Sequence, residues 1–283
     1  MKLPPDPLHH QKARAELEAL PPGRHYGASA DGQCWVMIGR ALRDVETWSI
    51  VPPSASLTLA WGAGGCELTF EGGGFAMTVG HWMWIDAGFA HHGRNISGSD
   101  FLTVMFSDHC VSRACLHLAP IGAQAQAAPA DLADMLIGLA ARMLRADPHS
   151  PFEAPARDAI LDWVGTHFPP RETPTLADAP VEHALTMMRA RALGDGSISE
   201  IAEDVGLSRS ELSRRFARRY HITPVAYRRQ LRLAMATRAL ALGQSVTSAA
   251  TAAGFADTAH LSRTFKDQYG ISPSLWAGIV ARP

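Results

Sequence analysis

The sequence is short of cysteine and has no long apolar run. Its four cysteines, Cys34, Cys66, Cys110 and Cys115, are too few and too scattered for a disulfide scaffold. No apolar run approaches the roughly 18 residues that a membrane span needs. The opening residues, MKLPPDPLHHQKARAEL, lack the apolar core of a signal peptide. We therefore expect a soluble cytoplasmic protein with reduced thiols and no membrane partner.

The chain also has almost no net charge, but the charges are unevenly distributed. The formal net charge is −1, yet residues 181–283 carry 14 Lys and Arg against 8 Asp and Glu, whereas the other 180 residues carry 12 against 19. Thirteen of the 14 C-terminal cations are arginine, whose guanidinium suits paired contacts with phosphate and guanine. This asymmetry indicates that the C-terminal third binds a polyanion and that the remainder does not.

Residues 197–273 contain one pattern written twice. The copies are SISEIAEDVGLSRSELSRRFARRYHITP and SVTSAATAAGFADTAHLSRTFKDQYGISP. In the first copy, Ser197 or Ser199 can cap a helix that stops at Gly206, and Ser208 can cap a second helix running to about Tyr220. The matching positions of the second copy are Ser245, Gly254 and Asp257. Two helices joined by a short glycine-containing turn predict a helix-turn-helix, whose second helix enters the major groove of DNA.

One uninterrupted helix is predicted between the copies, from Pro224 to Leu242, with Gly243 after its end. At 1.5 Å per residue this helix would be about 28 Å long. That length is close to the ~34 Å repeat of duplex DNA. The helix could therefore hold two recognition helices in successive turns of the major groove.

The N-terminal half has a sequence pattern typical of antiparallel β-structure. Short alternating runs broken by glycine predict strands at 34–38, 56–61, 67–70, 76–79, 81–85 and 101–106. Strands of this length and spacing form a sandwich or a barrel. Five of the seven tryptophans lie here, namely Trp35, Trp48, Trp61, Trp82 and Trp84.

Residues 80–95, GHWMWIDAGFAHHGRN, resemble the second conserved motif of the cupin barrel, G-x5-P-x-G-x2-H-x3-N, with Asp86 in place of proline. The resemblance implies a strand, a tight turn and a second strand. Metal-binding cupins also need an earlier H-x-H and a glutamate, and no such H-x-H precedes Gly80. Because a catalytic metal needs about three protein ligands, we expect a barrel without a metal, a cofactor or catalytic residues.

The predicted α+β chain has two domains. Residues 1–168 would form a cupin-like antiparallel β-barrel (about 25–107) with following helices (about 108–168), and the prolines of 169–181 predict a linker. Residues 131–147 carry an apolar stripe wide enough to pack on the barrel and to pair with a second copy. Residues 182–283 would form an all-α domain with two helix-turn-helix units joined by a long helix.

The C-terminal hundred residues resemble the DNA-binding domain of the AraC/XylS family of bacterial transcription regulators. The shared features are paired A-x-x-x-G turns, Arg-x-Phe in both recognition helices, the stretch GFADTAHLSRTFK from Gly254, and the closing Gly270-Ile-Ser-Pro273. The family's sugar-type regulators also carry an N-terminal cupin-like barrel followed by dimerising helices. The resemblance therefore implies a transcription regulator, an activator or a repressor, and not an enzyme.

Members of this family read bases from the outward face of each recognition helix. The matching positions are Ser210, Ser213 and Arg214 in the first copy and Thr258, Ala259, His260, Ser262 and Arg263 in the second, with Arg218, Arg219 and Lys266 placed for phosphates. Arg214 and Arg263 are the candidates for guanine contacts. His221 replaces a usual glycine and Ser210 is small, so we expect the first recognition helix to end differently and the second copy to read more bases.

The expected partners are double-stranded DNA, a small-molecule effector, a second copy in a homodimer and, as a further candidate, RNA polymerase. The effector site would lie in the barrel at Trp35, Trp48, Trp82, Trp84 and His91, although the tryptophans could instead simply fill the barrel. Two alternatives stay open. Cys110 and Cys115, with His109 and His117, could sense a metal or an oxidant, and a cupin enzyme could be fused to the DNA-binding domain.

Overall fold

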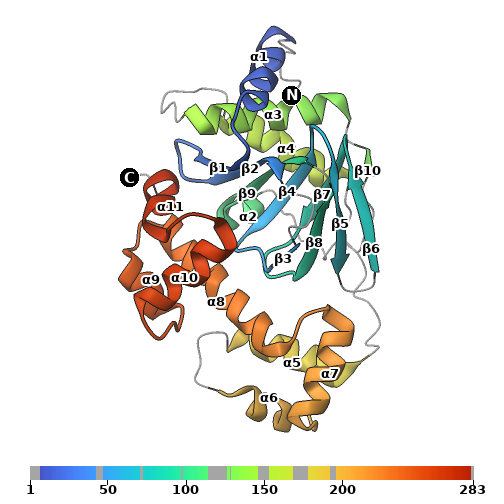
Figure 1. Ribbon diagram of the computed structural model, residues 1–283, viewed down its shortest axis with the longest axis vertical. Coiled ribbons are helices and arrows are strands. Elements are labelled where there is room, and N and C mark those ends of the chain that lie inside the picture. Colours follow the sequence, from blue (N-terminus) through green and yellow to red (C-terminus); the bar gives the residue numbers. More distant parts are fainter. Residues whose placement is uncertain are drawn as a thin grey trace.

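The computed structural model describes residues 7–42, 47–70, 73–96, 98–113, 126–127, 129–145, 153–167, 178–191 and 196–281. Figure 1 shows a group of helices at the top, two β-sheets in the middle, and the C-terminal helices below and to one side. In the described part of the chain, no helix combines the length and the apolar character needed to cross a membrane.

The sheets are antiparallel, as predicted. Sheet A has the order β1-β2-β9-β4-β7-β10 and sheet B the order β3-β8-β5-β6. The strands are β1 Gly23–Ala28, β2 Cys34–Leu42, β3 Thr47–Ile50, β4 Ala55–Ala60, β5 Gly65–Phe70, β6 Gly73–Thr78, β7 His81–Ile85, β8 His91–Ile96, β9 Ser99–Phe106 and β10 Gln126–Ala127. The predicted barrel is wrong, because the two sheets face each other without closing. Among the described residues no ladder joins an edge strand of sheet A to one of sheet B, and helix α11 covers the β1 edge instead.

The predicted strand, turn and strand of residues 80–95 are confirmed as β7 and β8. Gly80 and Gly88 have φ of +83° and +77°, the left-handed region that glycine enters at little cost. The Phe89 N–H donates to the Asp86 carbonyl at 3.2 Å and closes the turn. Because β7 belongs to sheet A and β8 to sheet B, this turn carries the chain from one sheet to the other.

Helices cover the outer face of sheet A. They are α1 Pro7–Glu18, α2 Asp108–Arg113, α3 Ala130–Arg145 and α4 Glu153–His167. The apolar stripe of α3 packs on sheet A, on α1 and on α4, with Leu132, Leu136, Leu139 and Met143 fully buried. The stripe is thus covered within one chain, and its pairing with a second copy stays a prediction.

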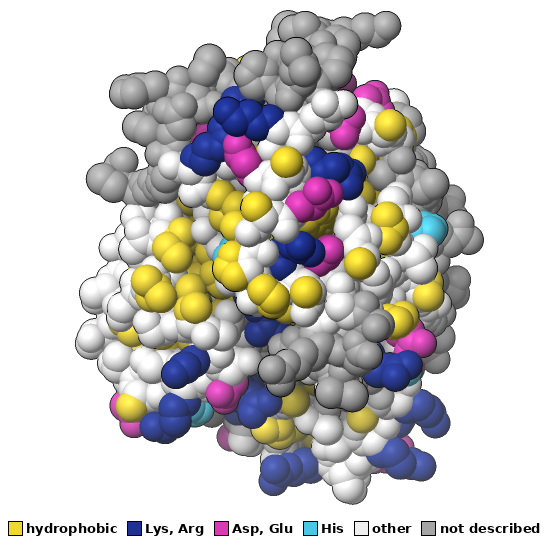
Figure 2. Space-filling model, turned by 45° about the horizontal axis from the view of Figure 1, so that its top comes forward, with side chains coloured by type: hydrophobic (Ala, Val, Ile, Leu, Met, Phe, Trp, Pro, Cys, Tyr) yellow, Lys and Arg dark blue, Asp and Glu magenta, His cyan; other side chains and the backbone are white. Residues whose placement is uncertain are grey.

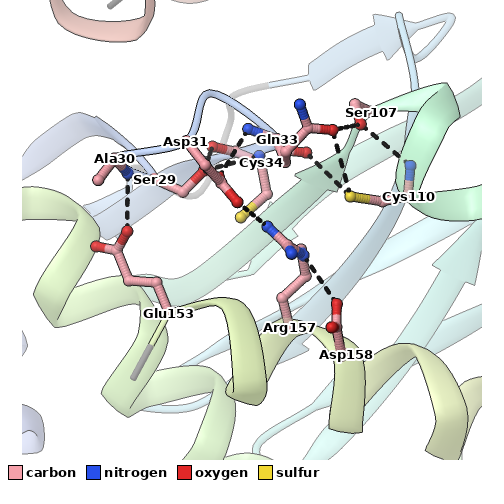
Figure 3. Close-up of polar contacts among 10 residues, drawn as sticks. All are labelled: Ser29, Ala30, Asp31, Gln33, Cys34, Ser107, Cys110, Glu153, Arg157 and Asp158. Carbon is pink, nitrogen blue, oxygen red and sulfur yellow. Dashed lines mark hydrogen bonds and ion pairs between the residues drawn. The ribbon is translucent and has the colours of Figure 1, made fainter. Parts of the chain in front are cut away.

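A polar network fastens α2 and α4 to the turn between β1 and β2 (Figure 3). The guanidinium of Arg157, whose side chain is only 4% exposed, pairs with the carboxylate of Asp31. The Glu153 carboxylate accepts from the Ala30 N–H at 2.8 Å. The thiol of Cys110 lies 3.6 Å from the side-chain oxygen of Gln33. Cys110 therefore lies among contacts that hold α2 and α4 to the sheet.

The C-terminal helices follow the predicted order. They are α5 Ala179–Ala190, α6 Ile198–Asp204, α7 Arg209–Tyr220, α8 Pro224–Ala241, α9 Val246–Ala252, α10 Thr258–Tyr269 and α11 Pro273–Val280. We call α6 and α7 unit 1, and α9 and α10 unit 2. The predicted connecting helix is confirmed as α8, whose 18 residues span about 27 Å.

Candidate nucleic-acid interface

Side-chain caps set where the four helices of the two units begin. Ser197 and Glu200 form a reciprocal capping box, which identifies Ser197 rather than Ser199 as the first cap. The other three caps each accept from the backbone N–H three residues later, and they are Ser208, Ser245 and Asp257, as predicted. Since a capped helix keeps its first turn ordered, both recognition helices, α7 and α10, present a defined first turn.

The two units also share their turns and their ends. Gly206 and Gly254 sit in the turns with φ of +73° and +70°. Helix α10 ends at Gly270 with φ of +79°, and α7 ends at His221 with φ of +54°. The difference that we expected at the end of α7 is thus one of residue type and not of backbone region, although at Gly270 the cap N–H also bonds to the Lys266 carbonyl. Histidine enters the same left-handed region, which costs an L-residue roughly 1–2 kcal/mol.

Four of the five arginines of α7 separate into two pairs. Arg215 and Arg219 bond to Asp178, just before α5, and to Glu182 within α5, and so hold the recognition helix against α5. Arg219, which we expected at a phosphate, is thus occupied in packing. Arg214 and Arg218 are four residues apart, lie on one face of the helix, and are exposed.

The predicted DNA-contact residues are all at least partly exposed. The exposed ones are Ser210, Arg214, Arg218, Ala259, Arg263 and Lys266, and the half-buried ones are Ser213, Thr258, His260 and Ser262. The His260 ring packs edge-on against Phe255, 5.2 Å between centroids. Lys and Arg side chains gather along the lower part of the molecule in Figure 2, where these helices lie. Arg214 and Arg263 make no ion pair with any described residue, so their charges are available to a polyanion.

One exposed cation of this face, Arg209, was not among the predicted contact residues. Arg209 is the first residue of α7 and is exposed, and it too has no ion pair within the described part of the chain. The first turn of a recognition helix is the part that lies nearest the base edges. Its position directly after the Ser208 cap was the signal that could have identified it.

A cavity of about 80 Å³ lies between the two sheets. One water needs roughly 10–15 Å³ by this measure, so the cavity has room for a ligand of several non-hydrogen atoms. Its lining is mostly apolar and includes Met37, Met77, Met83 and Met105, which are adaptable side chains. Gln268 and Tyr269 of the recognition helix α10 also line it, so the cavity touches unit 2 directly.

Only two of the five predicted effector residues, Trp48 and His91, line this cavity. Their rings meet edge-on with centroids 5.4 Å apart. The other three tryptophans pack elsewhere, Trp35 on Trp276, Trp82 on Trp163 and Trp84 on Phe106. Strand alternation places Trp82 and Trp84 on the face of sheet A opposite to Met83 and Ile85, which do line the cavity.

Most titratable groups of the described lining are uncharged at neutral pH, and burial favours their neutral forms further. Burial lowers the pKa of His91 to about 4 and raises the pKa of Cys66 to about 12 and that of Tyr269 to about 12. The guanidinium of Arg24 is then the charged group of the described lining. The cavity thus combines an apolar body with one positive charge.

The cysteine alternative finds little support in the described residues. Cys110 is 4% exposed and faces Gln33, whereas the neighbouring His109 is exposed. Cys115 and His117 lie outside the described residues. Reactive thiols are accessible and activated, and Cys110 is not accessible. Among the described residues no group of three or more His, Cys, Asp or Glu is placed to hold a metal ion.

Comparison with known proteins places residues 182–278 in a family described as a helix-turn-helix domain. The HTH-type transcriptional regulator GbdR of Pseudomonas aeruginosa is 30% identical over 94 residues, which are 33% of this chain and 26% of that protein. The match thus spans about a quarter of that relative's length.

Among solved structures, ToxT of Vibrio cholerae with a bound unsaturated fatty acid has a TM-score of 0.51 and 11% identity, covering 87% of this chain and 95% of ToxT. ToxT bound to (E)-4-(8-methylnaphthalen-1-yl)but-3-enoic acid gives a TM-score of 0.51 and 10% identity, covering 88% of this chain and 99% of ToxT. At such identities the likeness shows a shared fold. The two capped units, their turns and the family match agree on one identification: residues 182–278 are an AraC-type helix-turn-helix domain.

Proposed function

We propose that the protein is a DNA-binding transcription regulator whose N-terminal region, residues 1–168, controls the domain at 182–283 through a short linker. The observation that carries this proposal is the pair of matching recognition helices that present Arg214 and Arg263 to solvent, neither of them ion-paired to a described residue. The exposed Arg209, Arg218 and Lys266 beside them supply further charge for phosphate contacts.

Selection from a pool of randomised DNA duplexes with the purified full-length protein tests this function. We expect one enriched motif with two half-sites. Arg263→Ala should weaken specific binding about five- to 150-fold, since a good guanine contact contributes roughly 1–3 kcal/mol. Arg94→Ala is the matched control, because Arg94 is an exposed arginine that lies on sheet B, outside both recognition helices, and pairs with Glu67. If the wild type, Arg263→Ala and Arg94→Ala bound the selected DNA with equal affinity, the proposed function would be refuted.

The proposed division of base reading can be measured on the selected motif. The first recognition helix offers the small Ser210 where the second offers the larger Thr258 and His260. We therefore expect base substitutions in the half-site of unit 2 to weaken binding more than those in the half-site of unit 1. Equal losses in both half-sites would contradict this expectation.

We further propose that the cavity between the sheets binds a small molecule with an apolar body and an acidic group. Support comes from the methionine-rich lining and from Arg24, and the two ToxT structures are named for acids of this kind. Mass spectrometry of small molecules extracted from the purified protein tests the proposal. Arg24→Met should lose an acidic ligand that the wild type retains, whereas the Arg94→Ala protein should keep it. A sugar in the extract would contradict the proposed class.

We also propose that the protein works as a homodimer, as the family resemblance implies, and that it acts through RNA polymerase rather than as an enzyme. Sedimentation of the full-length protein measures the first point, and a stable monomer at working concentrations would refute it. Elemental analysis tests whether the protein is an enzyme, since a stoichiometric bound metal would favour the cupin-enzyme alternative.

A further inference from the structure

The N-terminal region contacts the two recognition helices at equivalent positions. Tyr220 and Tyr269 are the last residues of α7 and α10 and match in the repeat, 49 residues apart. The backbone carbonyl of Tyr220 lies 3.2 Å from Nε2 of His92 in β8. The carbonyl of Tyr269 accepts from the hydroxyl of Tyr26 in β1 at 2.5 Å. Because the last carbonyls of a helix have no partner within the helix, both contacts fasten a helix end.

A second matching pair shows the same arrangement. Tyr227 in α8 and Trp276 in α11 are also 49 residues apart. The Tyr227 hydroxyl donates to the Gly88 carbonyl, in the turn between β7 and β8, at 3.0 Å. The Trp276 ring meets Trp35 of β2 edge-on, with centroids 5.1 Å apart. Matching residues of the helices that follow the two units thus also contact the sheet region, one at the turn between β7 and β8 and the other at β2.

The contact made by His92 has a defined direction. A carbonyl can only accept, so the hydrogen must be on Nε2, and in the neutral ring Nδ1 then accepts from the Ser49 hydroxyl at 2.7 Å. Burial lowers the pKa of His92, which favours this neutral form. The ring is therefore oriented from both sides.

We propose that Tyr26 and His92 are positioning residues that set the separation of the two recognition helices, and thereby the spacing between the two half-sites in DNA. The inference rests on the proposed DNA binding. Helix α8 joins the units, and their cores include different residues of it, Tyr227 and Leu231 for unit 1 and Leu233, Ala236 and Leu240 for unit 2. Holding both helix ends to the sheets fixes the units relative to each other and leaves the first turns of α7 and α10, the part nearest the bases, unobstructed.

The test compares duplexes built on the selected motif, with the spacer between half-sites lengthened or shortened by one base pair. Affinities are measured for the full-length wild type, for Tyr26→Phe, for His92→Ala and for the double variant. A hydrogen bond of this kind contributes roughly two- to tenfold to an equilibrium constant. The penalty for a wrong spacer should therefore fall by about tenfold in the double variant and by less in each single variant. Tyr26→Phe removes a single oxygen atom, so it keeps the test valid if His92→Ala unfolds.

His81→Ala is the control, because His81 lies in β7 and its ring bonds to Thr78 within the same turn. It should show the wild-type spacing profile. If the variants lose affinity equally at every spacer, the two residues only stabilise the fold and the proposal is overturned. It is also overturned if the variants gain affinity equally at every spacer, since the sheets would then hold the units away from DNA. If the wild type enriches no motif at all, the proposed function fails and this inference fails with it.

Discussion

Unit 1 and unit 2 have the same local structure but different surroundings. Both begin at side-chain caps, turn at a left-handed glycine and end in a left-handed residue. The core of unit 2 continues through Trp276 and Trp35 into the core of the N-terminal region. The core of unit 1 forms a separate cluster, to which Val51 and Ala90 are the only described residues of the N-terminal region that belong.

The packing inside the units differs in the same way. Arg215 and Arg219 of unit 1 are ion-paired to Asp178 and Glu182, at and within α5. Their counterparts in unit 2 are Thr264 and Gln268, and Gln268 accepts from the neutral amide of Gln230 in α8. The residues that the two copies share thus determine the shape of each unit. The positions at which the copies differ decide which elements each unit packs against. We conclude that unit 2 is anchored to the sheets and that unit 1 is attached by weaker, more polar contacts.

The largest expected difference between the two units is in the stability that their apolar contacts with the sheets contribute. Trp35→Ala should lower the free energy of unfolding by about 3–5 kcal/mol, because it removes a buried indole from the contact with Trp276 of α11. Val51→Ala, on the unit 1 side, should cost only about 2 kcal/mol, since two methyl groups are lost. Urea unfolding measures both values. Hydrogen exchange should quicken in α10 and α11 for Trp35→Ala only, and faster exchange in α7 instead would break the comparison.

Acid should destabilise the fold through His91, which lines the cavity between the sheets. The folded-state pKa of His91, about 4, is below its unfolded value near 6.5. The stability that depends on neutral His91 is therefore complete above pH 6.5 and is lost as the pH falls towards 4, at a slope approaching ~1.4 kcal/mol per pH unit.

Urea midpoints between pH 7 and 4.5 check this prediction, with His91→Gln as the matched variant. Asp86 acts in the opposite direction because burial raises its pKa, so the difference between wild type and His91→Gln isolates the histidine. An identical slope in both proteins would show that His91 does not carry the effect.

The two turn glycines should respond unequally to alanine. A left-handed alanine costs roughly 1–2 kcal/mol at either position. At Gly206 nothing lies within 4 Å of an added Cβ, whereas at Gly254 the guanidinium of Arg232 lies 3.3 Å away. Gly254→Ala should therefore lower the urea midpoint more than Gly206→Ala. The reverse order would mean that Arg232 moves aside without cost.

The smallest expected effect concerns the end of α7. His221→Gly should raise the thermal midpoint slightly, by a stability gain of about 0.5–1 kcal/mol, because glycine relieves the left-handed backbone and gives back part of that gain as chain entropy. The reciprocal change, Gly270→His, should lower the midpoint by a similar amount. A lower midpoint for His221→Gly would indicate that the ring contact with His92, 6.5 Å between centroids, stabilises more than the backbone strain costs.

Much of the C-terminal domain was predictable because its signals are local. Ser208 and Asp257 act within three residues, and Gly254 acts on its own backbone. The strands at 81–85 and 101–106 were predicted for the same reason, since the alternation of apolar and polar residues is visible over a few residues. Strand β1 was missed because GRHYGA has two glycines and no alternating pattern, and β3 has only four residues.

The candidate sites divide similarly. The outward positions of α7 and α10 follow from helical spacing, so the exposure of Arg214 and Arg263 was predictable. The partners of Arg219 and of Trp35 were not, because Glu182 and Trp276 come from other elements. The same holds for the cavity, where only Trp48 and His91 of the predicted residues line the space.

By itself the sequence determined the two helix-turn-helix units, the single helix between them and the presence of antiparallel strands, because caps, glycine turns and apolar periodicity act over a few residues. Only the tertiary structure decided that the sheets stay open, that the cavity reaches Tyr269, and that the sheets hold the ends of both recognition helices. Tyr26 and Tyr269 are 243 residues apart. Contacts of that range depend on how whole elements pack, and no local pattern encodes them.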